Sequence, residues 1–301
     1  MSEPTILERI VARRREDVRT AKEAVPFVAL QARVRAAPPA LDFAARLRAA
    51  APMALMAEIK RASPSKGDIA PDMNAPRQAM KYARAGAAAI SVLTEPTWFK
   101  GTLDDMAQVR LAVGQLERRP AVLRKDFIVD PYQVLEARAH GADAVLLIVA
   151  SLTDAELGGL LGLAREMGME ALVEVDNAPA MERALAAGAS VIGVNNRDLR
   201  SFTIDLGTTG RLASMVPEGV VLAALSGISA RADIERFATA GARAVLVGEA
   251  LMLVSDPAAK VRELLGQPDP DRAAANKEHL DIRPGSESQF APTRPRGSSL
   301  R

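Results

Sequence analysis

Five side chains that could bind a substrate or transfer a proton lie at the ends of short apolar runs: Glu58, Lys60, Lys125, Glu174 and Asn195. If the first run is a strand, its period of two places Glu58 and Lys60 on the same face. Burying unpaired charge is costly, so two charges on one face indicate either a solvated edge or the rim of a working site.

Lys125 and Glu174 are the candidate acid and base. A lysine near other cations, such as Lys60, can donate a proton near neutrality. A glutamate in a partly apolar pocket, here beside Leu146 and Phe127, can accept one. Each charge alone has a simpler interpretation as a strand end entering solvent. Polar groups at several strand ends favour a common site.

Two short segments predict a phosphate cradle. Ser226 and Gly227 follow the seventh run, and Gly248 and Glu249 follow the eighth. Small residues let backbone N–H groups approach an anion, and barrels often bind phosphate at this pair of loops. Ser63, in the loop after the first run, could add a hydroxyl. The alternative for each loop is a tight turn that needs glycine.

Eight short apolar runs alternate with helix-length gaps, which is typical of a parallel sheet built from right-handed crossovers. The runs cover residues 54–60, 88–93, 121–125, 144–149, 172–175, 191–195, 220–224 and 244–247. Helical periodicity is expected over residues 75–85, 103–113, 131–139, 154–167, 178–187 and 229–240.

A repeated Gly-Ala-x-x-apolar segment opens the second, fourth, sixth and eighth runs, at Gly86, Gly141, Gly188 and Gly241. Glycine suits the left-handed position that ends a helix. The recurrence implies four repeated units of two strands each and predicts a (β/α)₈ TIM barrel. An open doubly wound sheet is the second choice, because its glycine-rich dinucleotide turn is missing.

Three segments make up the predicted domain organisation. Residues 1–50 form a helical extension, with helices at 6–24, 27–36 and 42–50, and residues 51–266 form the barrel. Residues 267–301 are rich in Pro, Ser, Gly, Asp and Arg and are expected to be a disordered tail. The run Arg13–Arg15 fits a solvated helix face better than a basic docking patch.

Composition narrows the class of protein. The 301 residues are 49% apolar and 25% charged, with a net charge of +2 and no cysteine. This excludes disulfides and thiol chemistry, and the two histidines lie far apart in the sequence, so we expect no metal. Nothing demands a nucleic acid or a membrane, and no apolar run reaches the ~20 residues of a membrane span. We expect a soluble, cytoplasmic protein that is a monomer, with an oligomer left open.

The chain resembles the indole-3-glycerol-phosphate synthase family of tryptophan biosynthesis from about residue 4 to 265. The resemblance rests on six segments taken together. They are EIKRASPSKG from Glu58, SVLTE from Ser91 with Phe99-Lys100-Gly101, LRKDFIVD from Leu123, LVEV from Leu172, GVNNRDL from Gly193 and LVGE from Leu246.

The resemblance implies a TIM barrel with an N-terminal helical segment over the active-site mouth. It implies closure of 1-(2-carboxyphenylamino)-1-deoxyribulose 5-phosphate to indole-3-glycerol phosphate with loss of CO₂ and water, and no cofactor. Lys125 would be the general acid, Glu174 the general base, and Lys60 would hold the substrate carboxylate or donate a proton. The remaining matched positions fall into three groups. Glu58 and Asn195 would position these groups, and Arg197 would belong to the same rim as a substrate-binding residue. Ser63, Ser226, Gly227, Gly248 and Glu249 would line the phosphate, and Phe127 and Leu146 would contact the anthranilate ring.

One position departs from the family pattern. The family usually has Glu-Ser-Gly after the seventh strand, whereas this chain has Leu225 before Ser226 and Gly227. Leu225 cannot hydrogen-bond or balance nearby lysines, so slower turnover is expected. Two alternatives stay open: an isomerase or Schiff-base aldolase using Lys125 or Lys60, and a weakly active or non-catalytic phosphate-binding barrel. Retention of the acid and base together argues against a pure binder.

Overall fold

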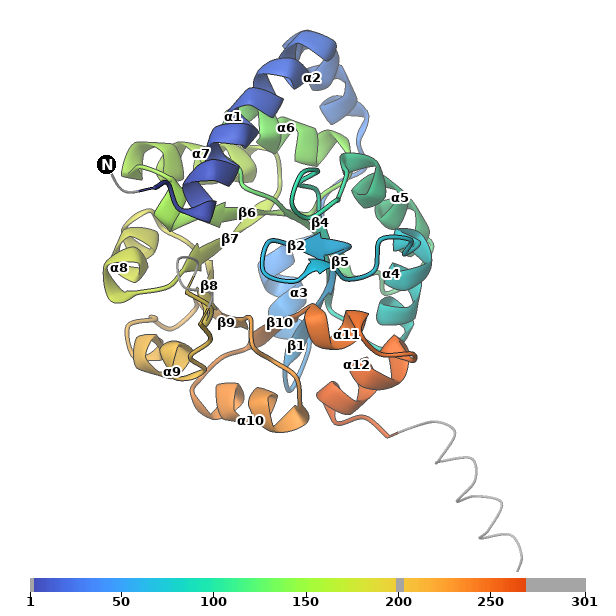
Figure 1. Cartoon of the computed structure of the whole chain (residues 1–301), viewed down its shortest axis with the longest axis vertical. Helices are drawn as coiled ribbons and strands as arrows, with labels where there is room; N and C mark the ends of the chain where they lie inside the picture. Colours follow the sequence, from blue (N-terminus) through green and yellow to red (C-terminus); the bar gives the residue numbers. More distant parts are fainter. Residues whose placement is uncertain (1–2, 199–202, 269–301) are drawn as a thin grey trace, which may run out of the picture. The chain divides into compact units, whose positions relative to one another are not determined.

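Eight parallel strands close into a barrel in the computed structural model of the chain, which describes residues 3–198 and 203–268. Figure 1 shows the strands as a ring surrounded by helices. The TIM-barrel prediction is therefore confirmed. The barrel strands are β1 (Ala54–Ile59), β4 (Ala89–Leu93), β5 (Ala121–Lys125), β6 (Ala144–Ile148), β7 (Glu170–Val175), β8 (Val191–Asn195), β9 (Val221–Leu225) and β10 (Ala244–Val247).

Helices follow the strands around the outside of the barrel. They are α4 (Ala75–Arg84), α5 (Leu103–Val113), α6 (Pro131–Ala139), α7 (Asp154–Glu166), α8 (Ala178–Ala186), α9 (Gly207–Ala213), α10 (Arg231–Thr239), α11 (Glu249–Met252) and α12 (Pro257–Leu265), with a 3₁₀ turn η1 (Val149–Ser151). Sequence periodicity missed α9, α11 and α12. It also missed a small hairpin of β2 (Ala62–Ser63) and β3 (Gly67–Asp68).

Alternate residues along each strand divide the core into two layers, as the period of two requires. On β1, Ala54 and Met56 pack inside the barrel, while Leu55, Ala57 and Ile59 pack against the helices. Gly86, Gly141, Gly188 and Gly241 all have a positive φ, between 80° and 98°, just before an even-numbered strand of the barrel. The left-handed role predicted for this repeat is confirmed.

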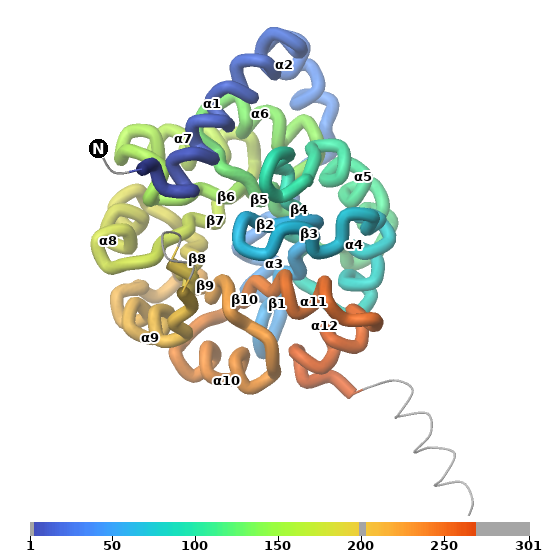
Figure 2. The backbone as a smooth tube through the Cα atoms, in the orientation of Figure 1, coloured from blue at the N-terminus to red at the C-terminus, as the bar shows by residue number. Residues whose placement is uncertain are grey.

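Three helices precede the barrel: α1 (Ile6–Ala24), α2 (Phe27–Ala36) and α3 (Phe43–Ala49). The first two pack through Val18 and Leu30 against Tyr132 and Leu135 of α6, beside which they lie in Figures 1 and 2. None of the helices in the described residues is long and apolar enough to cross a membrane.

Helix α3 closes the barrel at the N-terminal ends of the strands. Phe43 and Leu47 join the inner core. The Arg46 and Arg48 guanidiniums donate to the carbonyls of Arg118 and Gly219, which lie in loops that lead into β5 and β9. The extension is thus divided, with α3 below the barrel and α1 at the opposite end. The disordered tail predicted for residues 267–301 lies outside the described residues from 269 onward.

Candidate active site

A cavity of about 450 Å³ opens at the C-terminal ends of the strands. Its wall contains every predicted site residue except Leu146: Glu58, Lys60, Ser63, Lys125, Phe127, Glu174, Asn195, Arg197, Ser226, Gly227, Gly248 and Glu249. They come from strand ends and loops spread over more than 190 positions of the sequence, and the closed barrel brings them to one rim.

Glu58 and Lys60 form an ion pair at the end of β1, with 2.7 Å between the Lys60 Nζ and a Glu58 carboxylate oxygen. Burial opposes ionisation of Glu58, but Lys60, Lys125 and Arg197 outweigh it and lower the pKa of the carboxyl. Glu58 is therefore an acceptor that holds lysine ammonium groups in place. The interpretation of this pair as the rim of a site, not a solvated edge, agrees with its place in the cavity wall.

Lys125 and Glu174 face each other from β5 and β7, with 3.7 Å between Lys125 Nζ and Glu174 Oε2. This separation is too long for a direct hydrogen bond. Asn195 on β8 donates its side-chain N–H to Glu174 Oε1 at 2.9 Å and accepts the Arg197 backbone N–H at 3.0 Å. Since both ends of the Asn195 amide are engaged, the Glu174 carboxylate is fixed while its second oxygen faces Lys125.

The opposite side of the cavity has the features of an anion site. Ser226 and Gly227 are successive left-handed residues, with φ of 67° and 80°, which turns the backbone after β9 toward the cavity. A Cβ at Gly248 would lie 2.4 Å from a Glu58 carboxylate oxygen, so a larger residue there would displace Glu58. Glu249 stands between two cations, 3.3 Å from Lys66 and 3.8 Å from Arg197.

The apolar wall differs in part from the prediction. Phe127 lines the cavity with Phe99, and their ring centroids are 5.9 Å apart. Leu146 lies lower, in the inner core, where its strand pairs it with Leu172. Ile148, paired with Glu174 one pleat higher, lines the cavity in its place.

Helix α1 adds Ile6, Leu7 and Ile10 to the wall. Sequence reasoning did not include these residues, although the amphipathic spacing of α1 marked it as a helix with an apolar face to bury. They place the first helix of the chain directly over the cavity.

Leu225 ends β9 and is 2% exposed. It pairs across the sheet with Asn195, and a Cβ at Gly193 would lie 2.7 Å from its Cδ1. Gly193 thus leaves the space that the Leu225 side chain fills. Within residues 3–198 and 203–268, no cluster of His, Cys, Asp and Glu side chains is arranged to hold a metal ion.

The family model and the sequence relatives agree on one family. The family model for indole-3-glycerol phosphate synthase matches residues 7–264. A multifunctional tryptophan biosynthesis protein from Schizosaccharomyces pombe is 54% identical over 265 residues, which cover 87% of this chain and 35% of that protein. An indole-3-glycerol phosphate synthase from Roseiflexus sp. is 50% identical over 87% of this chain and 98% of its own length.

The chain therefore spans about a third of the fungal relatives and nearly all of the bacterial one. Among solved structures, a 3-hexulose-6-phosphate synthase aligns with a TM-score of 0.58 at 20% identity, covering 71% of this chain and 99% of that one. At this identity the likeness concerns the fold alone. The family match over most of the barrel, together with relatives at half identity, shows that the chain belongs to the indole-3-glycerol phosphate synthase family.

Proposed function

We propose that the chain catalyses the family's reaction, a decarboxylating ring closure. The substrate is 1-(2-carboxyphenylamino)-1-deoxyribulose 5-phosphate, and the products are indole-3-glycerol phosphate, CO₂ and water. The observation that carries the proposal is the pair of Lys125 and Glu174, 3.7 Å apart in a cavity whose two sides both offer cations or anion-binding turns. A substrate with a carboxylate at one end and a phosphate at the other fits such a cavity.

Ring closure is the first step. The ring carbon that carries the carboxylate attacks the ribulose C2 carbonyl, and a carbon–carbon bond forms as the carbonyl π electrons move to oxygen. Lys125 protonates that oxygen, which avoids a free alkoxide. Phe127, Phe99 and Ile148 present an apolar surface to the aromatic ring, which excludes water from the reacting atoms.

Loss of CO₂ and water completes the reaction. Breaking the bond to the carboxylate returns its electron pair to the ring, so no external electron sink is needed. The Lys60 ammonium then protonates the new hydroxyl, which leaves as water, and Glu174 takes the ring proton whose removal produces the indole double bond. Asn195 holds Glu174 in place for this step through its 2.9 Å hydrogen bond.

We propose that separate groups of the cavity wall hold the two ends of the substrate. Lys60, held by Glu58, is the proposed partner of the substrate carboxylate. The turns at Ser226–Gly227 and Gly248–Glu249 are the proposed phosphate site, with the Ser63 hydroxyl reaching from the β2–β3 hairpin. Arg197 connects the proposed phosphate site with the acid and base, because its backbone N–H fixes Asn195 and its side chain pairs with Glu249.

In this proposal, Leu225 lowers the turnover rate. With leucine at the end of β9, this strand adds no carboxylate to the cavity beside those of Glu58 and Glu174. We propose that the chain closes the ring with the same groups as its relatives but turns over more slowly.

The direct test is to add the carboxyphenylamino-deoxyribulose phosphate to the purified chain and follow indole fluorescence. Fluorescence should grow with enzyme concentration and be lost in the Lys125→Met variant. Borohydride added during turnover should leave no covalent adduct. No fluorescence from the folded wild-type chain, or a trapped adduct on a lysine, would refute the proposal.

A further inference from the structure

Asp126 lies between two residues of the cavity wall, the proposed acid Lys125 and the aromatic Phe127, yet it faces away from the cavity. It is 1% exposed and takes hydrogen bonds on both oxygens. Oδ1 accepts from the Phe127 backbone N–H at 2.8 Å. Oδ2 accepts from the Thr94 hydroxyl at 2.6 Å and from the Arg124 guanidinium at 3.0 Å.

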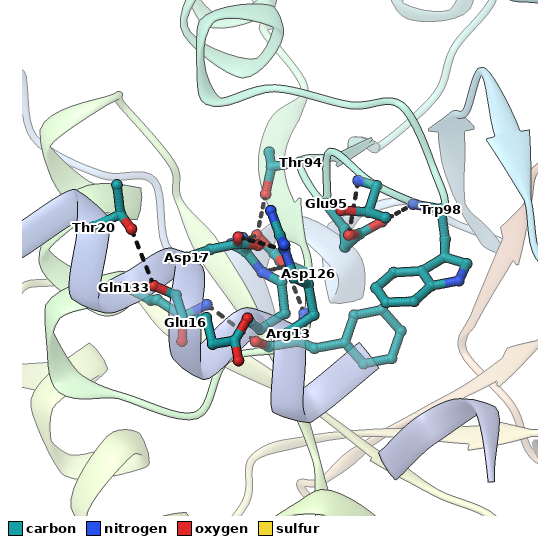
Figure 3. A network of polar contacts seen from close by, with 12 residues as sticks. Arg13, Glu16, Asp17, Thr20, Thr94, Glu95, Trp98, Asp126 and Gln133 are labelled. Atoms are coloured by element: carbon teal, nitrogen blue, oxygen red, sulfur yellow. Dashed lines mark hydrogen bonds and ion pairs between the residues drawn. The ribbon is translucent and has the colours of Figure 1, made fainter. Parts of the chain in front are cut away.

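A second arginine reaches Asp126 from outside the barrel. Arg14 of α1 donates Nε to Oδ1 at 3.0 Å and Nη2 to Oδ2 at 2.9 Å, the two-pronged geometry that matches a carboxylate. It is 6% exposed, so the ion pair is shielded from solvent. Figure 3 shows Asp126 and Thr94 behind helix α1, with Arg13 and Asp17 on the helix.

The same helix forms part of the cavity wall. Ile10 lines the cavity and Arg14 follows one turn later, so both lie on the face of α1 that meets the barrel. The bond from Arg14 to Asp126 therefore sets how closely Ile10 approaches the cavity. It also fixes the position of the segment at the end of β5 that carries Lys125 and Phe127.

We propose that Arg14 is a positioning residue for the reaction and acts through Asp126 on Lys125 and Phe127. The inference rests on the proposed function, since it concerns where the acid stands. Without Arg14, Oδ1 of Asp126 keeps the Phe127 N–H, while Thr94 and Arg124 draw the carboxylate toward Oδ2. The carboxylate then rotates, the Phe127 backbone follows, and Lys125 leaves its place opposite Glu174.

Charge balance gives a second reason for the pairing. Arg124 and Arg14 are buried with Asp126, and Glu136 lies 3.3 Å from Arg124. Arg14 also donates Nη1 to Asp17 of its own helix at 2.9 Å, so three carboxylates surround the two buried guanidiniums and neither positive charge is left unpaired, as buried charge requires. Arg14 thus completes a cluster assembled from α1, β5, α6 and the loop that follows β5.

Steady-state kinetics of Arg14→Met, Arg14→Lys, Arg13→Met and Ile10→Ala test the inference. Arg13 is the matched control because it is half exposed and its ion pair is with Asp17, whose separate 2.9 Å bond to Arg14 the Arg13→Met substitution leaves in place. A 1 Å misplacement of an acid can cost on the order of 100-fold, so Arg14→Met should lower kcat by about 10-fold or more while KM changes less than about 3-fold. Arg14→Lys should recover part of kcat, and Arg13→Met should match wild type.

Ile10→Ala separates positioning from simple helix docking. It removes cavity wall but keeps the ion pair, so it should raise KM with a smaller effect on kcat. If Arg14→Met behaves like Ile10→Ala, or like Arg13→Met, the inference is wrong. If Arg14→Met does not fold, Arg14→Lys decides alone, because wild-type kcat in that variant would show that the two-pronged bond has no positioning role. An inactive wild-type chain would instead overturn the proposed function.

Discussion

Lys125 Nζ and Glu174 Oε2 lie 3.7 Å apart across the end of strand β6, which separates β5 from β7. This distance is too long for a hydrogen bond, yet too short for another molecule to fit between the two groups. One substrate oxygen at the edge of this gap could contact both groups. The arrangement suits a sequence in which one group gives a proton and the other later takes one.

Removal of the acid is the first prediction. Lys125→Met should lower kcat/KM by about 10² to 10⁴-fold, the usual contribution of general acid catalysis. Indole fluorescence measures the rate, and Lys260→Met is the control, because Lys260 pairs with Glu263 on α12 outside the cavity wall. A Lys125→Met variant that keeps wild-type activity would remove Lys125 from the mechanism.

Removal of the base should separate the two halves of the reaction. In a single turnover of Glu174→Gln, CO₂ release should run ahead of indole formation, because ring closure and decarboxylation precede the step that needs Glu174. Lys125→Met should slow both signals equally. Equal slowing in Glu174→Gln would place Glu174 at the ring-closing step instead.

Leu225→Glu should raise kcat several-fold and also raise KM. A carboxylate at the end of β9 could hydrogen-bond groups that leucine cannot, which is the expected gain in rate. In the wild-type chain, the cavity wall carries three cations and three carboxylates: Lys60, Lys125 and Arg197, and Glu58, Glu174 and Glu249. A further negative charge would repel the anionic substrate. Leu225→Gln is the neutral control, and an unchanged or lower kcat in Leu225→Glu would refute the slower-turnover proposal.

Acid unfolding should depend on Arg14. Burial opposes ionisation of Asp126, but Arg124, Arg14, Thr94 and the Phe127 N–H lower its pKa overall. A carboxyl with a lowered pKa adds stability that is fully present above about pH 4, the unfolded value, and is lost as pH falls through the folded pKa. Arg14→Met should raise that folded pKa and so unfold at a higher pH than Arg13→Met, as followed by circular dichroism. Coincident acid transitions would contradict this.

Helix α3, below the barrel, should contribute several kcal/mol to the free energy of unfolding. Phe43 of α3 is fully buried, whereas Phe27 of α2 is 52% exposed. Phe43→Ala should lower the free energy of unfolding by about 3 to 5 kcal/mol, since a large core side chain leaves a cavity. Phe27→Ala should change it by less than about 0.5 kcal/mol. Urea unfolding measures both, and equal effects would mean that α3 does not carry core stability.

The eight strands and most helices could be predicted because a closed barrel imposes a strict pattern on the sequence. Most strand residues are apolar on both faces, and six of the helices around the barrel are followed by a glycine with a positive φ: Gly86, Gly141, Gly168, Gly188, Gly241 and Gly266. The β2–β3 hairpin escaped prediction because strands of two residues have no period. Leu146 was placed in the site and Ile148 was not, although both point inward; the pairing of Ile148 with Glu174 shows at which residue of β6 the cavity begins.

Arg14 marks a different limit of sequence reasoning. Three consecutive arginines on a helix predict a solvated face, and this is right for Arg13 and Arg15, which remain half exposed. Asp126, the buried partner of Arg14, is 112 residues away, and no local sequence pattern connects the two residues. Long-range pairing of this kind becomes visible only when the chain is folded.

The position of α3 has a consequence for synthesis. Arg48 bonds the carbonyl of Gly219, which is 171 residues later in the chain. At about 5 to 20 residues per second, α3 leaves the ribosome roughly 10 to 30 s before that partner exists. During this time Phe43 and Leu47 have no barrel floor to cover them. The apolar face of α3 therefore stays uncovered in the nascent protein, which cannot finish folding until its last strands are made.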